Sequence, residues 1–186
     1  METRNAVTAS VHELVANRWS PRGFDATHEL NDAELASILE AARWTPSASN
    51  TQPWAFIVGR RGGEVFDKIF ATLGGFNRDW ACAVSALIVA VAEVEKADGT
   101  AMPSPLYDLG QSAAWMTVQA ESMGLNVHQM LGFDADAVAA AFEVPSGLRP
   151  YTVIAIGKHS DDVDASIRER DAAPRGRAEL RVLAQD

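Results

Sequence analysis

The sequence predicts an α+β fold in a single domain over residues 1–186. Two nearly continuous apolar runs, 84–91 and 151–157, have the length of strands covered on both faces. Elsewhere, as in 30–44 and 106–123, apolar residues recur at the spacing of helices. Because 47% of its 186 residues are apolar, the chain can bury one sizeable core. We therefore expect helices packed against a buried sheet.

Composition argues against several classes of function. The formal net charge of −9 disfavours an extended surface for nucleic acid or anionic membranes. No apolar run reaches the ~18 residues of a membrane-spanning helix, and the first residues lack a signal-peptide pattern. The one cysteine, Cys82, is expected to pack as a small hydrophobe and suits a reducing cytosol. We expect a cytoplasmic protein with no nucleic-acid or membrane partner.

The first half of the chain should alternate helices with a strand. Residues 7–17 carry apolar side chains at helical spacing, which predicts a first helix. A second helix begins after Asn31, where Glu34 completes a capping box. A strand is expected over 54–58, and a short amphipathic helix over 64–73 ends at two glycines.

The second half should return to the sheet. The loop 94–105 leads to a helix over 106–123 that is apolar nearly all round, so it is buried in the core or against another subunit. A strand and turn follow, and Asp134 caps a further short helix. After the last strand at 151–157, the charged remainder is typical of a disordered tail.

Residues 45–54, Thr-Pro-Ser-Ala-Ser-Asn-Thr-Gln-Pro-Trp, concentrate short polar side chains in one loop. Pro46 ends the helix before the loop, and Pro53 helps to begin the strand after it. Hydroxyl and amide side chains either bond the backbone of their own turn or hold a polar, planar ligand. Composition alone favours the first interpretation.

Two arginines flank a serine in the segment Arg18-Trp19-Ser20-Pro21-Arg22. Two guanidinium groups and a hydroxyl suit a phosphate monoester. Arginines near the C-terminus of a helix also complement its dipole, which is a purely structural explanation. The residues themselves leave both explanations open.

The order of these motifs resembles the nitroreductase family of FMN-dependent NAD(P)H oxidoreductases. The loop is similar to the family's Pro-Ser-x-x-Asn-x-Gln-Pro-Trp segment at Pro46, Ser47, Asn50, Gln52, Pro53 and Trp54. Its Arg-x-Ser-x-Arg motif resembles Arg18, Ser20 and Arg22, and its C-terminal basic pair resembles Arg175 and Arg177. The resemblance implies a nitroreductase-like three-layer α/β/α sandwich with a mostly antiparallel central sheet, in an intertwined homodimer.

The resemblance also implies where each motif stands around FMN. Residues from both ends of the chain would hold the phosphate and ribityl end, namely Arg18, Trp19, Ser20, Arg175 and Arg177. Arg22 and Asn77 would face the pyrimidine edge of the ring, whereas Trp80 stands where some relatives carry a lysine, which leaves a contact from that position open.

Two further segments would complete the site. A backbone amide from the turn Met130, Leu131 and Gly132 would face flavin N5. Pro46, Ser47, Asn50 and Gln52 would reach the flavin from the other subunit, so each site would lie at the subunit interface.

The residues alone supply no catalytic motif. There is no nucleophile elbow, metal-ligand spacing or carboxylate pair, and the histidines are scattered. Such a chain either catalyses nothing or takes its chemistry from a cofactor. The resemblance implies FMN reduced by NADH or NADPH, ping-pong transfer to a small oxidised acceptor, and an electrostatic role for Arg22. The acceptor class stays open between nitroaromatics, quinones and activated carbonyl or alkene compounds. So do flavin cleavage, dehalogenation, and a flavin-binding or storage role without turnover.

Overall fold

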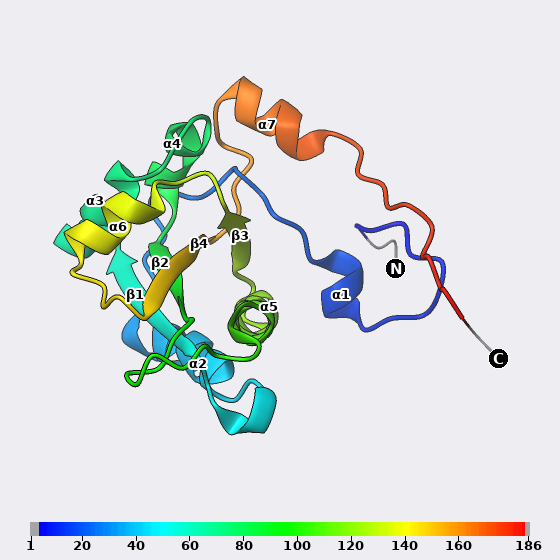
Figure 1. Ribbon diagram of the computed structural model, residues 1–186. Helices are drawn as coiled ribbons and strands as arrows, with labels where there is room; N and C mark the ends of the chain where they lie inside the picture. The colour runs from blue at the N-terminus through cyan, green and yellow to red at the C-terminus, as the bar shows by residue number, and fades with distance from the viewer. Residues whose placement is uncertain (1–3, 185–186) are drawn as a thin grey trace.

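The computed structural model describes residues 4–184, in which an antiparallel sheet lies between two layers of helices (Figure 1). The four strands have the order β1-β2-β4-β3 and comprise β1 (Trp54–Arg60), β2 (Ala86–Glu93), β3 (Asn126–Met130) and β4 (Leu148–Gly157). Helices α3 (Glu64–Ala71) and α6 (Ala135–Ala141) pack on one face, and α2 (Asp32–Arg43) and α5 (Pro105–Ser122) on the other. The predicted α+β class is confirmed.

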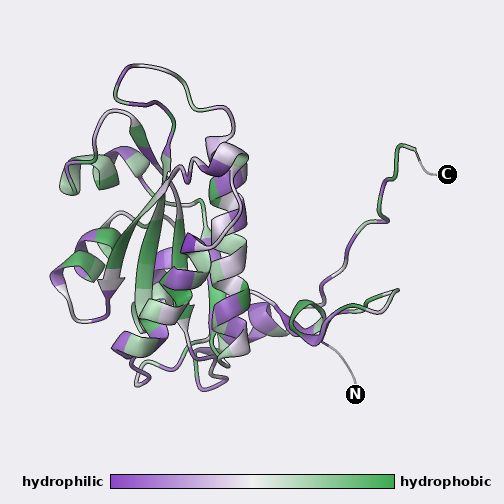
Figure 2. Ribbon diagram, turned by 90° about the horizontal axis from the view of Figure 1, so that it is seen from below, coloured by the Kyte–Doolittle hydropathy of each residue, from purple (hydrophilic) through white to green (hydrophobic). Residues whose placement is uncertain are grey.

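Strand β2 explains why the core has two halves. Every residue from Ala86 to Ala92 is buried, and alternate side chains point to opposite faces. Leu87, Val89 and Val91 join the cluster under α3 and α6, whereas the even-numbered residues join the cluster under α2 and α5. Figure 2 shows the hydrophobic residues concentrated on the strands between the helices.

Local sequence signals placed most boundaries well. Asn31 caps α2 through Glu34 in the expected capping box, and the Asp134 side chain accepts a hydrogen bond from the Ala137 amide at the start of α6. β4 begins earlier than expected and bulges at Tyr151, because Ala90 pairs with Thr152 but Val91 with Pro150.

Over residues 4–184, every helix is too short or too polar to cross a lipid bilayer.

Three expectations were wrong. The first helix is only α1 (Glu13–Asn17), and Val7 and Val11 are exposed because this arm extends away from the sheet (Figure 1). The charged remainder contains α7 (Ala165–Ala172), which packs through the buried Ile167. Cys82 is exposed in the 3-10 turn η2 (Ala81–Ala83), which follows α4 (Asn77–Trp80), rather than packed as a small hydrophobe.

The two arms of the chain lie side by side outside the main body. The N-terminal arm, residues 4–12, and the tail, residues 173–184, extend on the same side in both views (Figures 1 and 2). Arg175 Nη2 donates a hydrogen bond to Asn5 Oδ1 at 2.6 Å, which joins the two arms.

Candidate functional site

The two arms form the walls of a cavity of about 880 Å³. Arg18, Arg175 and Arg177 line it together with apolar residues of both arms and with the polar residues Asn5, Thr8 and Glu179. Arg18 Nη1 donates to Ser20 Oγ at 3.2 Å, so the guanidinium and the hydroxyl face the same space. The structure thus brings together the predicted residues from both ends of the chain.

The arginine cluster comprises Arg4, Arg18, Arg175 and Arg177. The carboxylates near it are Glu179, which lines the same cavity, and Glu121, whose pKa is raised by burial against the opposing charge of Arg18. Desolvation first, and then the charges of Arg4, Arg18 and Arg177, lower the pKa of Arg175 from its ordinary value. Among residues 4–184 no carboxylate lies within ion-pairing distance of these four arginines. Like charges held together without an ion-pair partner favour binding of an anion, and a dianionic phosphate ester fits the donors present.

Trp19 supports the cluster rather than lining it. The indole is 6% exposed, and the Arg4 guanidinium lies 3.2 Å from its ring centroid. The His159 ring meets its edge at 5.0 Å between centroids. The predicted residue Trp19 therefore holds the N-terminal arm by a cation–π contact, with its own side chain covered.

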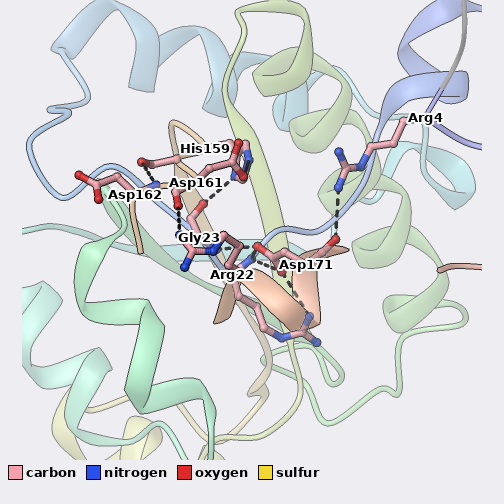
Figure 3. A network of polar contacts seen from close by, with 9 residues as sticks. Arg4, Arg22, Gly23, His159, Asp161, Asp162 and Asp171 are labelled. Atoms are coloured by element: carbon pink, nitrogen blue, oxygen red, sulfur yellow. Dashed lines mark hydrogen bonds and ion pairs between the residues drawn. The ribbon is translucent and has the colours of Figure 1, made fainter. Parts of the chain in front are cut away.

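The backbone around Arg22 is held by Asp171, His159 and His128, the first two of which are shown in Figure 3. Asp171 of α7 accepts hydrogen bonds from the Arg22 amide at 2.8 and 3.0 Å and from the Gly23 amide at 2.8 Å. His128 Nδ1 lies 2.7 Å from the Pro21 carbonyl oxygen, and His159 Nδ1 lies 2.9 Å from that of Gly23. Any Cβ at Gly23 would overlap the Ser160 carbonyl oxygen, so only glycine fits there.

His128 is a structural residue in this arrangement. Because a carbonyl oxygen only accepts, Nδ1 carries the hydrogen and donates to Pro21. Burial lowers the pKa of His128, and the hydrogen bond to Pro21 opposes that change. The His128 and Trp80 ring centroids are 4.7 Å apart, and Trp80 is 1% exposed. Trp80 is therefore a core residue that does not reach a surface ligand.

The predicted turn after β3 lies next to Asn77. Asn77 Nδ2 donates to the Gly132 carbonyl oxygen at 3.2 Å, and a Cβ at Gly132 would come within 2.9 Å of that nitrogen. The Gly132 amide is exposed and has no partner among the described residues, so it is free to donate to a ligand. Met130 is buried, whereas Leu131 is 71% exposed.

A second cavity of about 310 Å³ adjoins this turn. Its lining is mostly apolar and consists of Leu109, Gly110, Ala113, Gln129, Leu131, Tyr151 and Thr152. The β4 bulge places Tyr151 there with 46% of its surface exposed. The cavity offers a mostly apolar surface for part of a ligand.

The loop 45–54, called the central loop below, is mostly exposed and is strained. Ser49, Asn50 and Gln52 all have φ between 51° and 56°, which non-glycine residues rarely adopt. The Gln52 amide donates to Ser47 Oγ at 3.0 Å, and the Ala48 amide donates to the buried carboxylate of Asp108 at 3.2 Å. Pro46, Asn50 and Gln52 are exposed, as residues that meet a ligand or a second chain must be.

The central loop and residues 21–23, called the Arg22 segment below, lie at opposite ends of the sheet (Figure 1). The loop leads directly into Trp54 of β1, which pairs with Ala92 of β2. Ala92 in turn pairs with Arg149 near the start of β4. Gly23 bonds to His159, just past the other end of β4. At about 3.3 Å per residue the two ends are roughly 30 Å apart. One chain therefore does not bring these two predicted motifs together.

Three residues of the site escaped sequence analysis. Asp171 lies in a stretch that resembles a disordered tail, and Arg4 precedes every recognisable motif. Asp108 did carry a signal, because it is an acidic residue in the first turn of a helix rich in apolar residues. A buried carboxylate needs a partner, and here the partners are the Ala48 amide and the Ser104 hydroxyl.

Comparison with protein families gives a match to the nitroreductase family over residues 15–79. That stretch contains Arg18–Arg22, the central loop and Asn77. An uncharacterized 15.4 kDa protein of Mycolicibacterium smegmatis is 41% identical over 138 residues, which cover 69% of this chain and 92% of that protein. The oxygen-insensitive NADPH nitroreductase of Helicobacter pylori strain J99 is 36% identical over 77 residues, 41% of this chain and 36% of that enzyme.

A solved structure agrees over the full length. The crystal structure of an oxidoreductase containing FMN matches with a TM-score of 0.91 and 28% identity, and covers 100% of this chain and 96% of that one. The two short arms and α7 are thus included in the likeness, together with the sheet.

Proposed function

Because the chain belongs to the nitroreductase family, we propose that it is an FMN-dependent oxidoreductase that uses NADH or NADPH as reductant. In this proposal residues 1–186 act as one FMN-binding domain. The observation that carries it is the cluster of Arg4, Arg18, Arg175 and Arg177, which forms no ion pair with a carboxylate within residues 4–184 although the net charge of the chain is −9.

The chain's own residues fit FMN at three points. Arg18, Ser20, Arg175 and Arg177 hold its phosphate through charge-assisted hydrogen bonds, which contribute roughly 1.5–3 kcal/mol each. The Gly132 amide would donate a hydrogen bond to flavin N5. A backbone amide does not change protonation state with pH, as a side-chain donor can. The small apolar cavity beside Leu131 takes the edge of a planar ring.

Bound FMN would supply the redox chemistry, accepting a hydride from NAD(P)H and delivering electrons to a second substrate by ping-pong exchange. Arg22 places a positive charge at the pyrimidine edge, which stabilises the added negative charge of the reduced state. The acceptor is a small oxidised compound such as a nitroaromatic, a quinone or an activated carbonyl or alkene. No acidic or basic side chain at the cavity selects among them.

We further propose that the active unit is a homodimer with one FMN site at each end of the interface. Within one chain the central loop and the Arg22 segment are roughly 30 Å apart. If both touch one flavin, they belong to different subunits. The outer face of α5 supports such an interface, because Tyr107, Trp115 and Val118 are 72%, 51% and 46% exposed while the opposite face is buried.

The absorption spectrum of the purified protein tests the cofactor. We expect the two bands of oxidised flavin, and mass spectrometry of the released cofactor should give FMN. Anaerobic stopped-flow mixing with NADH and with NADPH should then bleach the longer-wavelength band rapidly with at least one of them. Failure to bind FMN after reconstitution would refute the proposal, whereas binding without bleaching would indicate a storage role.

A further inference from the structure

The Arg22 guanidinium has a carboxylate neighbour that the flavin roles above do not use. Arg22 Nη1 lies 3.7 Å from Asp171 Oδ1, outside hydrogen-bonding distance. The side chain of Arg22 is 33% exposed, whereas that of Asp171 is 6% exposed. The arginine can therefore reach a ligand while the aspartate stays behind it.

Asp171 holds the backbone more firmly than it holds the guanidinium. Its two carboxylate oxygens accept three contacts of 2.8 to 3.0 Å from the amides of Arg22 and Gly23. These contacts join residues 149 and 148 positions apart in the sequence. Hydrogen bonds to an ionised acceptor are among the stronger ones in proteins. Asp171 of α7 is thus the one support of this backbone that bonds the Arg22 amide itself, beside His128 at Pro21 and His159 at Gly23.

The neighbouring groups leave Asp171 as the charge that faces Arg22. His128 bonds the Pro21 carbonyl, and burial lowers its pKa, so it stays neutral there near neutral pH. His159 bonds the Gly23 carbonyl and the exposed Asp161. Arg4 donates a hydrogen bond to the backbone carbonyl oxygen of Asp171 and not to its carboxylate.

We propose that Asp171 is a positioning residue for Arg22, and that it sets the reduction potential of the bound flavin through that arginine. It fixes the backbone that carries the guanidinium and neutralises part of its charge at 3.7 Å. This inference rests on the proposed FMN function. Asp171 itself lies behind Arg22 and touches neither the flavin nor the substrate.

The first experiment needs no flavin. Hydrogen exchange of the Arg22 and Gly23 amides should become about tenfold faster in Asp171→Asn, because an amide side chain has one acceptor oxygen in place of two. Asp162→Asn is the matched control, since it removes the same charge from an exposed residue of the preceding loop. Unchanged exchange in Asp171→Asn would overturn the anchoring role, whether or not the protein binds FMN.

The second experiment is a double-mutant cycle on the two-electron midpoint potential of FMN-saturated protein. Asp171→Asn should favour the reduced flavin by about fivefold, which is about 20 mV, because Arg22 keeps its full charge. Arg22→Leu should lower the potential, and adding Asp171→Asn to Arg22→Leu should change it little further.

Two outcomes of the cycle would overturn the inference. An equal shift with and without Arg22 would mean that Asp171 acts directly through space. No rise in Asp171→Asn, relative to Asp162→Asn, would mean that the carboxylate does not neutralise Arg22. Arg22→Lys separates charge from side-chain geometry, because it keeps the positive charge at this backbone position. If that charge sets the midpoint potential, the potential of Arg22→Lys should stay close to that of wild type.

Discussion

The Arg22 segment and the central loop would face the same cofactor, but the chain supports them differently. The Arg22 segment is held by Asp171, His128 and His159, and its turn is closed by a glycine that nothing larger can replace. The central loop has three residues in the left-handed region, each costing about 1–3 kcal/mol. Beyond its own turn contacts, the loop is held by the Asp108 carboxylate at Ala48 and by the Glu93 amide, which donates to the Pro53 carbonyl oxygen at 3.0 Å where the loop enters β1.

The difference indicates where each part obtains its support. The Arg22 segment is complete within its own chain, so it can be ready for the cofactor before any partner arrives. The central loop exposes Pro46, Asn50 and Gln52 in a strained backbone, and such strain persists where surrounding structure supports it. We expect that support from the second subunit of the proposed dimer.

The largest expected effect is loss and recovery of FMN binding across two subunits. One variant carries Pro46→Glu with Asn50→Asp, and the other carries Arg18→Glu with Arg177→Glu. Each homodimer should bind FMN poorly, since the arginine pair alone contributes roughly 3–6 kcal/mol. After co-refolding, about half the dimers are mixed and one site in each mixed dimer is intact, so roughly a quarter of all sites should recover.

Titration with FMN measures that recovery, and each variant refolded alone is the control. Arg181→Glu provides a charge-matched comparison for the arginines, because it lies in the exposed tail outside the cavity lining. If verified mixed dimers regain no binding, the central loop and the arginine pair Arg18 and Arg177 meet at one flavin within a single chain, and the second subunit does not supply the loop's support.

Gly23→Ala should break the support of the Arg22 segment. The added Cβ would overlap the Ser160 carbonyl oxygen and crowd Asp171, so the free energy of unfolding should fall by about 3 kcal/mol, the upper range for overpacking. Gly176→Ala is the matched control, because nothing lies within 4 Å of its Cβ position. Urea unfolding measures both. Equal stability of the two variants would show that the backbone around Gly23 can shift to accommodate a Cβ.

Asp108→Asn should loosen the central loop with a smaller cost. The Ala48 amide and the Ser104 hydroxyl would lose an ionised acceptor, which is worth roughly 1.5–3 kcal/mol. Ser104→Ala removes only the hydroxyl contact and separates the two. Hydrogen exchange of residues 46–53 should quicken in Asp108→Asn but stay near wild type in Ser104→Ala. Similar exchange rates in both variants would mean that the hydrogen bond from the Ala48 amide to Asp108 does not keep the loop ordered.

The smallest effect concerns His128 and is confined to acid. Burial lowers its pKa from 6.5, so below that pH the unfolded chain binds a proton that the folded chain resists. Stability is therefore complete above about pH 6.5 and declines as pH falls, until the folded pKa is reached. His128→Gln should show a shallower decline between pH 7.5 and 5.5 in urea unfolding. A decline as steep as wild type would exclude His128 as its source.

The fold was predictable where the signal was local. The unbroken apolar run of β2 and the capping box of α2 need only neighbouring residues, and both were confirmed. The first helix was overestimated because Val7 and Val11 have helical spacing but no core to pack against. Helix α7 was missed because it has one buried apolar residue, Ile167, and depends on contacts made elsewhere.

The candidate site divides in the same way. The motif residues near Arg18, the central loop and Gly132 were identifiable by order and spacing along the chain. The groups that their supports bind were not identifiable, because Asp108 and Asp171 bond backbone amides 60 and 149 positions away. Every residue except proline has a backbone N–H group. The sequence therefore does not indicate which residue's amide a buried carboxylate will bind.

The Asp171 contacts also bear on the order in which the molecule folds. Closing a loop of 149 residues costs about 3 kcal/mol more entropy than closing a four-residue turn. The antiparallel pairs of β1, β2 and β4 should therefore form before α7 docks, when much of that entropy has already been lost. Contacts that form last on a structured body are commonly among the first to open. In an unfolding time course, α7 and the arginines beyond it should separate early, and the flavin pocket should be lost while the sheet is still intact.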